Sequence, residues 1–149
     1  MAIILIIAAI AIPNMLRARM AANESAAISS IRTIATAEVT YITTYPTTGY
    51  AATLAVLGAG GVNPCVASSA SACLIDDVLA GASVAPGKSG YIYTAPGTAS
   101  TFLITASPVA PGSSGQRSFC SVADSVVRYN SSGAAIANSA ACLALSAVN

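Results

Sequence analysis

The first thirteen residues of the chain carry no charge, are aliphatic at nearly every position, and end in Pro13. A helix built from them has no side suited to water, so it must be buried in lipid or among other helices. A helix that spans a bilayer needs about 20 apolar residues, more than the run before Pro13 supplies. A cleaved secretory signal would have a basic segment before the apolar run and a cleavage site after it. No basic residue precedes this run and the helical pattern continues past Pro13, so we expect an uncleaved, buried helix.

The apolar run leads directly into a polar step, PNMLRAR, at residues 13–19. Together, residues 2–19 resemble the N-terminal helix of bacterial type IV pilins and of the related pseudopilins of type II secretion. The resemblance is close over residues 1 to about 45 and looser afterwards. In that family the mature chain starts upstream, with an aromatic residue and a glutamate in its first turn, and a helix that spans a bilayer would need about eight to ten more apolar residues before Met1. Either Met1 is an internal start, or this chain departs from the family pattern. The resemblance also implies a leader that ends in glycine and is removed by a prepilin peptidase.

The resemblance further implies a function as a structural subunit, the major pilin of an extracellular filament on a bacterial cell surface. Its partner would be itself, in a helical homopolymer. Before assembly it would sit in the inner membrane, where the pilus or secretion assembly machinery would handle it. The residues expected in the filament core are Ile3, Ile4, Leu5, Ile6, Ile7, Ile10, Ile12, Pro13 and Leu16.

Two other functions remain open at this point. A pseudopilin of a type II secretion system would share the helix and the sheet, and would form a short periplasmic piston. A membrane-anchored tip adhesin would need a larger head with a distinct pocket, which about 100 residues hardly provide.

The composition agrees with burial in a polymer. Hydrophobic residues make up 55% of the chain and charged residues only 7%, whereas ordinary soluble proteins contain about 25% charged residues. The net charge is +1, and Arg17 and Arg19 form the only basic cluster. Nucleic-acid binding usually needs a clustered basic face, so no specific nucleic acid is expected as a partner.

Four cysteines are present, Cys65, Cys73, Cys120 and Cys142, and they allow three disulfide connectivities. The short segment between the first two is rich in serine and permits a turn, so we predict the pairs Cys65–Cys73 and Cys120–Cys142. Zinc sites use closely spaced cysteine pairs or histidines, and the chain has neither. Disulfides place the protein outside the cytoplasm, and pilins often tie down their C-terminal region with one.

Past Pro13 the helical pattern becomes one-sided. We predict that this helix continues to Tyr45, because the residue before Pro46 avoids helical geometry. Proline also removes a backbone hydrogen bond, so in a crowded filament core we expect the helix to be interrupted at residues 8–12. Apolar residues recur at helical spacing at Ile28, Ile31, Ala35, Val39 and Ile42.

The rest of the chain reads as loops and strands. Runs rich in β-branched and aromatic residues occur at 90–94, 101–106, 117–122 and 125–129, separated by turn residues. This pattern predicts an α+β, pilin-like fold, with a long N-terminal helix packed on an antiparallel sheet of three to four strands. Residues 1–26 would form the apolar filament-core or membrane helix. Residues 27–149 would form the globular part, with a loop region at 46–88, a meander at 90–129 and a disulfide-tied C-terminal loop at 130–149.

No pattern in the sequence indicates catalysis. Histidine, the commonest general base, is absent. The only close carboxylate pair is Asp76-Asp77, and adjacent side chains point to different sides of a helix or strand. We therefore expect no enzyme activity, no catalytic residues, no cofactor and no metal. Asn130-Ser-Ser132 matches the glycosylation sequon, which makes Asn130 a candidate modification site.

Overall fold

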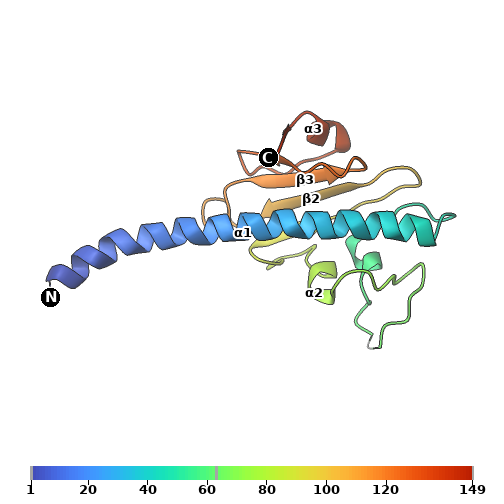
Figure 1. Ribbon diagram of the computed structural model, residues 1–149, viewed down its shortest axis with the longest axis horizontal. Helices are drawn as coiled ribbons and strands as arrows, with labels where there is room; N and C mark the ends of the chain where they lie inside the picture. Colours follow the sequence, from blue (N-terminus) through green and yellow to red (C-terminus); the bar gives the residue numbers. More distant parts are fainter. Residues whose placement is uncertain (1, 63, 149) are drawn as a thin grey trace.

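A computed structural model describes the backbone of residues 2–62 and 64–148, with side chains described from residue 14 onward within these ranges. Helix α1 (Ala2–Thr44) lies along one face of an antiparallel sheet with the strand order β1-β2-β3-β4-β5 (Figure 1). The strands are β1 (Tyr91–Thr94), β2 (Leu103–Pro108), β3 (Ser118–Val122), β4 (Arg128–Asn130) and β5 (Ser146–Ala147). Three short helical segments are η1 (Leu54–Leu57), α2 (Asp77–Ala80) and α3 (Ser139–Leu143).

Helix α1 ends where the sequence predicts. Its last residue is Thr44, and Tyr45-Pro46 follows, so proline terminates the helix through its effect on the preceding residue. The helix is unbroken from Ala2 and passes through Pro13. The interruption expected at residues 8–12 is therefore not present in the single chain, where a long helix accommodates one lost hydrogen bond. For the crowded interior of a filament, the interruption stays a prediction.

The main core lies between α1 and the sheet. Helix residues Ile31, Ile34 and Tyr41 are almost fully buried, as are Tyr93 and Phe119 of the facing strands. The predicted apolar stripe is only partly right, because Val39 is 45% exposed. The sheet contacts the side of α1 that carries Ile34 and Tyr41, so the position of the sheet, and not side-chain hydrophobicity alone, decides which face of the helix is buried.

The opposite face of the sheet is covered by the C-terminal segment. All residues of β3 are buried, so this strand has core on both sides. Its Cys120 packs with Leu103, Ile136 and Cys142 in a second, smaller cluster. Because small domains struggle to bury enough apolar surface, this cover depends on the link between Cys120 and Cys142.

The disulfides join Cys65 to Cys73 and Cys120 to Cys142, the pairing that the sequence predicts. The first closes a short loop between η1 and α2, and the second attaches α3 to β3. Both disulfides thus restrain segments that contain little regular structure.

The sheet has five strands, so the expected count of three to four was too low. The first four correspond to the four predicted runs. The fifth, β5, contains only Ser146 and Ala147, which pair with Tyr129 and Arg128 of β4. Serine and alanine have weak strand propensity, so no local pattern marks this strand. It forms because the preceding disulfide and α3 bring the tail alongside β4.

Replacing Cys120 and Cys142 together with serine is expected to lower the free energy of unfolding by about 3 kcal/mol. The two cysteines are 22 residues apart, and closing a loop of that size restricts the unfolded chain by about this amount. Urea unfolding followed by circular dichroism measures the change. The matched control replaces Cys65 and Cys73, which lie outside the core and are only 8 residues apart. A loss at the control pair equal to or greater than that at the buried pair would contradict the assigned role of the C-terminal cover.

Candidate functional site: the projecting helix and its junction with the head

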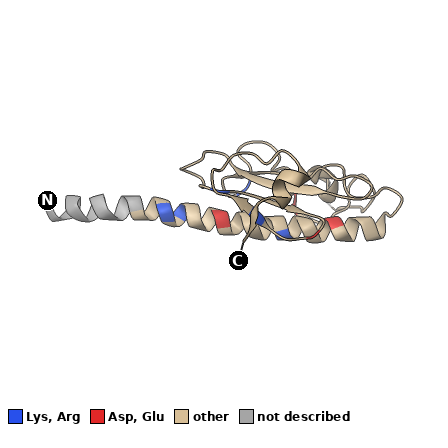
Figure 2. Cartoon of the chain, turned by 90° about the horizontal axis from the view of Figure 1, so that it is seen from above, with Lys and Arg blue, Asp and Glu red and all other residues tan. Residues whose placement is uncertain are grey.

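The N-terminal part of α1 extends beyond the sheet (Figures 1 and 2). We call residues 2–22 the stalk and residues 23–148 the head. The stalk is about 30 Å long at the usual helical rise. The side chains of residues 14–19 are all exposed, and Met15 reaches 77% exposure. Residues 14–19 of the stalk therefore form a surface that the head leaves largely uncovered.

Most of the predicted assembly residues fall in the stalk segment whose side chains are not described. These are Ile3, Ile4, Leu5, Ile6, Ile7, Ile10, Ile12 and Pro13. Leu16 is described, and it is 44% exposed despite its apolar side chain. Among the described residues, none of the helices combines the length and the hydrophobicity needed to cross a membrane.

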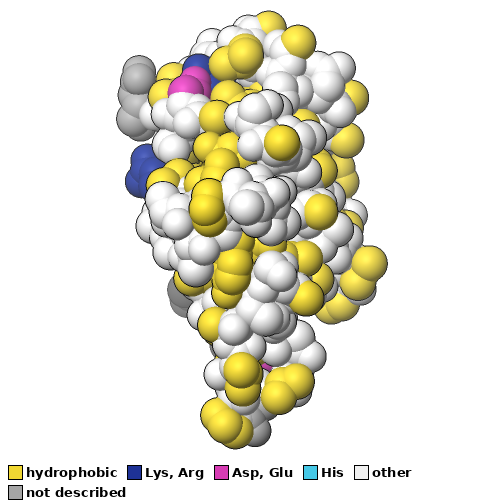
Figure 3. Space-filling view, turned by 90° about the vertical axis from the view of Figure 1, so that its right-hand side faces the viewer, with side chains coloured by type: hydrophobic (Ala, Val, Ile, Leu, Met, Phe, Trp, Pro, Cys, Tyr) yellow, Lys and Arg dark blue, Asp and Glu magenta, His cyan; other side chains and the backbone are white. Residues whose placement is uncertain are grey.

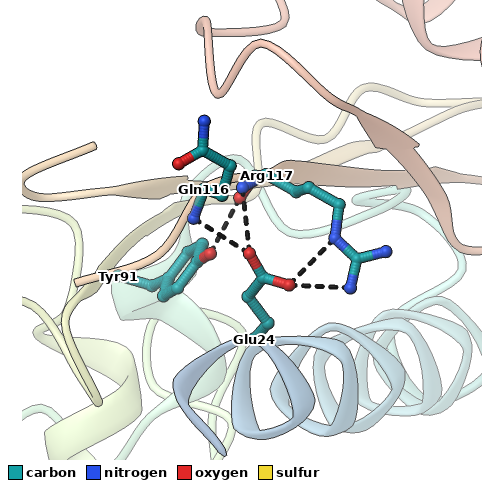
Figure 4. Close-up of polar contacts among 4 residues, drawn as sticks. All are labelled: Glu24, Tyr91, Gln116 and Arg117. Carbon is teal, nitrogen blue, oxygen red and sulfur yellow. Dashed lines mark hydrogen bonds and ion pairs between the residues drawn. The ribbon is translucent and has the colours of Figure 1, made fainter. Parts of the chain in front are cut away.

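The head begins at a polar junction on α1 (Figure 4). Asn23 donates its side-chain amide to the carbonyl oxygen of Ser114, at 2.8 Å. The next residue is Glu24, whose Oε1 accepts hydrogen bonds from the backbone nitrogens of Gln116, at 2.9 Å, and of Arg117, at 3.1 Å. Glu24 Oε2 accepts from Arg117 Nε and Nη2, at 2.9 and 2.7 Å. We call Glu24, Gln116, Arg117 and Tyr91 the clasp. Asn23 and Glu24 both lie within residues 1–26, the segment expected to form the filament-core or membrane helix.

The electrostatics of the clasp favour an ionised Glu24. Burial by itself raises the pKa of this carboxyl, but the hydrogen bonds and the positive charge of Arg117 outweigh it, and the pKa ends below its ordinary value. The Arg117 side chain remains 39% exposed, whereas that of Glu24 is only 9% exposed. Arg117 thus donates two charge-assisted hydrogen bonds to one carboxylate oxygen, and two backbone nitrogens donate to the other; hydrogen bonds between ionised groups are among the stronger polar contacts in proteins.

Aromatic side chains hold Arg117 in place. Its guanidinium carbon lies 5.5 Å from the ring centroid of Phe119 and 5.4 Å from that of Tyr129, distances at which cations are attracted to ring faces. The Tyr91 hydroxyl donates to the carbonyl oxygen of Arg117, at 2.8 Å. A Cβ at Gly115 would collide with that hydroxyl, so this position requires glycine. The loop between β2 and β3 is thereby attached to both α1 and β1.

The contacts of the clasp indicate a structural role. A groove of about 370 Å³ runs beside Glu24 and is lined by Ser25, Ile28, Arg32 and Val148 among others. A general acid or base needs a free lone pair or proton directed at a substrate. Both Glu24 oxygens already accept two hydrogen bonds each. The clasp is thus arranged to fix the head on the helix.

A second carboxylate of α1 is buried without a cation. Glu38 is 0% exposed, and its Oε2 accepts a hydrogen bond from the backbone nitrogen of Ala51, at 2.9 Å. Its Oε1 is buried and has no hydrogen-bond partner among the described residues. Burial raises the pKa of this carboxyl to about 7, although the bond from Ala51 opposes the shift.

The candidate glycosylation site lies at the end of β4. The side-chain oxygen of Asn130 accepts hydrogen bonds from the backbone nitrogen of Ser132, at 3.0 Å, and from its hydroxyl, at 2.9 Å. This arrangement closes the turn that the sequence predicts at residues 130–133. Use of the sequon stays a prediction.

Glu24 and Glu38 were not identified as functional residues from the sequence. A signal was present, because both lie on the stripe of helix positions 24, 28, 31, 35 and 38, which is otherwise apolar. Carboxylates are rarely buried unless they are paired. Few charges exist in this chain (Figure 2), so two acids on a buried face indicate contacts that the fold must satisfy. Their partners, a distant arginine and two loop backbones, could not be read from spacing.

Comparisons with protein-family models, with curated proteins and with solved structures each found no match. Within the described ranges, no three side chains of histidine, cysteine, aspartate or glutamate gather in a group that could hold a metal ion. The function therefore has to be argued from the stalk and the head themselves.

Proposed function

We propose that the chain is the structural subunit of an extracellular filament on a bacterial surface, and that it polymerises through the stalk. The observation that carries the proposal is the extension of α1 beyond the head with exposed Met15 and Leu16. The stalk continues to Ala2 through a sequence that is apolar on every side. Such a helix is stable in water only when other apolar surfaces cover it, and stalks of further copies would supply them.

The surface of the head supports a crowded setting. Figure 3 views the molecule from the end opposite the stalk and shows many hydrophobic and few charged side chains. Val66 is 76% exposed, and Val62, Val78 and Val84 are each more than half exposed. Charged side chains keep soluble monomers apart, and this chain has few. A subunit that is surrounded by copies of itself has less need of charged side chains.

The junction also suits a subunit that transmits tension along a filament. Tension along a filament would reach the head through α1, and the clasp attaches the sheet to that helix by four hydrogen bonds to one carboxylate. The two disulfides are compatible with an oxidising site outside the cytoplasm. Before assembly the stalk would reside in the inner membrane, and assembly machinery would transfer it to the filament.

Electron microscopy of filaments sheared from cells, with immunogold labelling of the head and mass spectrometry of the subunits, tests this proposal. We expect label along the whole length of each filament and this chain as its main component. Label confined to the ends would support the tip adhesin instead. Absence of the chain from surface filaments, together with a secretion defect in a deletion strain, would support the pseudopilin.

A further inference from the structure

We propose that Glu38 is a proton-controlled latch for the loop that follows α1. With the carboxyl neutral, Ala51 is held against the helix; with the carboxyl ionised, the loop opens more often. We call residues 46–53 the latch loop. The inference concerns the head alone and does not depend on the proposed polymerisation.

The geometry around Glu38 favours the neutral acid. The side chain is among the largest that are fully buried, and its single hydrogen bond comes from the backbone nitrogen of Ala51, at 2.9 Å. An ionised carboxylate has about four acceptor sites to satisfy. Here Oε1 is buried and has no partner among the described residues. A buried charge with one donor is costly, so ionisation and a closed latch loop oppose each other.

Groups around Glu38 do not supply a compensating charge. On α1 itself the titratable neighbours are Tyr41 and Tyr45, and the negative charge of Glu38 raises the pKa of Tyr41 further, after the effect of burial. Tyr50 precedes Ala51 in the latch loop, and Tyr93 faces α1 from β1. The segments η1, β2 and β3, which also contact α1, carry no free titratable side chain, since Cys120 is in a disulfide.

The cations of the head that form ion pairs do so elsewhere. Lys88, Arg117 and Arg128 pair with Asp76, Glu24 and Asp124, respectively. Arg32 lies on the exposed side of α1. Burial is accordingly the dominant influence on the pKa of Glu38, which rises to about 7.

The latch loop connects α1 to the hairpin of β1 and β2. The backbone nitrogen of Tyr50 donates to the carbonyl oxygen of Thr98, at 2.9 Å, and the Tyr50 ring packs edge-on against Phe102. The carbonyl of Ala51 lies so close to Gly97 that a side chain there would collide with it. Release of Ala51 from Glu38 therefore weakens the contacts that join α1, the latch loop and the connection between β1 and β2.

Opening should stay local, because both ends of the latch loop are anchored. On one side Tyr45 continues the hydrogen bonding of α1 through the carbonyl of Tyr41. On the other, Leu54 and Leu57 of η1 are almost fully buried. The sheet does not rely on the latch loop for its strand pairing.

The pH dependence has a defined sign. The pKa of Glu38 is about 7 when the latch loop is closed, compared with 4.5 for an exposed glutamate. The closed state thus binds the proton more tightly, and its advantage is complete below pH 4.5 and is lost as the pH rises through 7. Linkage with these two values predicts that the opening equilibrium rises about tenfold between pH 6 and pH 8.

Two measurements on the full chain in a non-ionic detergent test the latch. The first is a carbon-13 NMR titration of the Glu38 carboxyl, for which we expect a midpoint near 7. The second is hydrogen exchange at the Ala51 amide, corrected for intrinsic rates. We expect its protection to fall about tenfold from pH 6 to pH 8 and to stay well below that of the β2 and β3 amides, which exchange only on global unfolding.

Substitutions separate the latch from other effects of pH. In Glu38→Gln the protection of Ala51 should no longer depend on pH, whereas in Asp124→Asn, an exposed control, the dependence should persist. A carboxyl midpoint near 4.5 would overturn the proposal, and this result does not depend on whether the Gln variant folds. Protection of Ala51 equal to that of the β2 and β3 amides would overturn the local latch too, since it would indicate that the latch loop opens only when the whole head unfolds.

Discussion

A chain that begins at Ala21 is expected to form a folded, monomeric head and no filaments. The truncation removes the exposed Met15 and Leu16 together with the apolar residues before Pro13. It keeps Asn23 and the clasp, which contain the first contacts between α1 and the sheet. Because the apolar stalk is the surface that most needs covering, its loss should abolish polymerisation rather than weaken it. Analytical ultracentrifugation of the head and electron microscopy of cells that express it measure the two outcomes.

A second truncation, at a different position, serves as the control. A chain that begins at residue 26 loses Glu24 as well as the stalk, so it should also be monomeric but clearly less stable. Comparing the two by urea unfolding separates the proposed assembly role of the stalk from the contribution of the clasp to folding. Filaments formed by the chain that begins at Ala21 would contradict the proposed function.

Glu24→Ala should lower the free energy of unfolding by about 3 kcal/mol. The substitution leaves the Arg117 guanidinium and two backbone nitrogens without their acceptor. Removing one partner of a buried ion pair costs about 3–5 kcal/mol, and we expect the lower end because Arg117 is 39% exposed. Chemical unfolding of the full chain in detergent gives the value.

Asp124→Ala is the matched control, because it also removes a carboxylate from an arginine pair. Asp124 pairs with Arg128 four residues away, and its side chain is 37% exposed. Exposed pairs of this kind contribute little, so the effect should be much smaller. Equal losses at the two sites would show that the clasp is an ordinary surface contact.

The clasp and the latch should respond to pH in opposite directions. The pKa of Glu24 is lowered in the folded protein, so its contribution is present above its unfolded value of 4.5 and is lost as the pH falls through the folded value. The contribution of Glu38 is lost as the pH rises through about 7. The two contributions overlap near pH 4.5, so these two groups together should make the full chain most stable there. In Glu24→Gln the loss on the acid side should diminish while the loss on the alkaline side remains.

Much of the secondary structure follows from local sequence. Proline after Tyr45 ends α1, and β-branched and aromatic runs separated by turn residues produce the first four strands. The disulfide pairing follows from a short serine-rich loop, which leaves Cys120 and Cys142 as the second pair. These features depend on backbone preferences and short-range closure, and both can be read from neighbouring residues.

Other features arise only when distant segments meet. The two-residue strand β5 has no strand propensity of its own and forms because Cys142 holds the tail beside β4. Val39 belongs to the helical stripe yet is exposed, because the sheet covers a neighbouring face of α1. In these cases long-range packing outweighs a local pattern whose own contribution is small.

The sequence by itself determined that the chain has a long helix, that its first thirteen residues are uncharged and mostly aliphatic, and that the whole chain carries few charges. Tertiary structure alone decided what its two helical acids do. Glu24 binds Arg117, which lies 93 positions away in the sequence, and becomes a more readily ionised member of the clasp. Glu38, on the same stripe, meets only the backbone of Ala51 and becomes a buried acid that titrates near neutral pH. The physical reason is that a carboxyl's ionisation depends on its burial and on the donors around it, and folding assigns both.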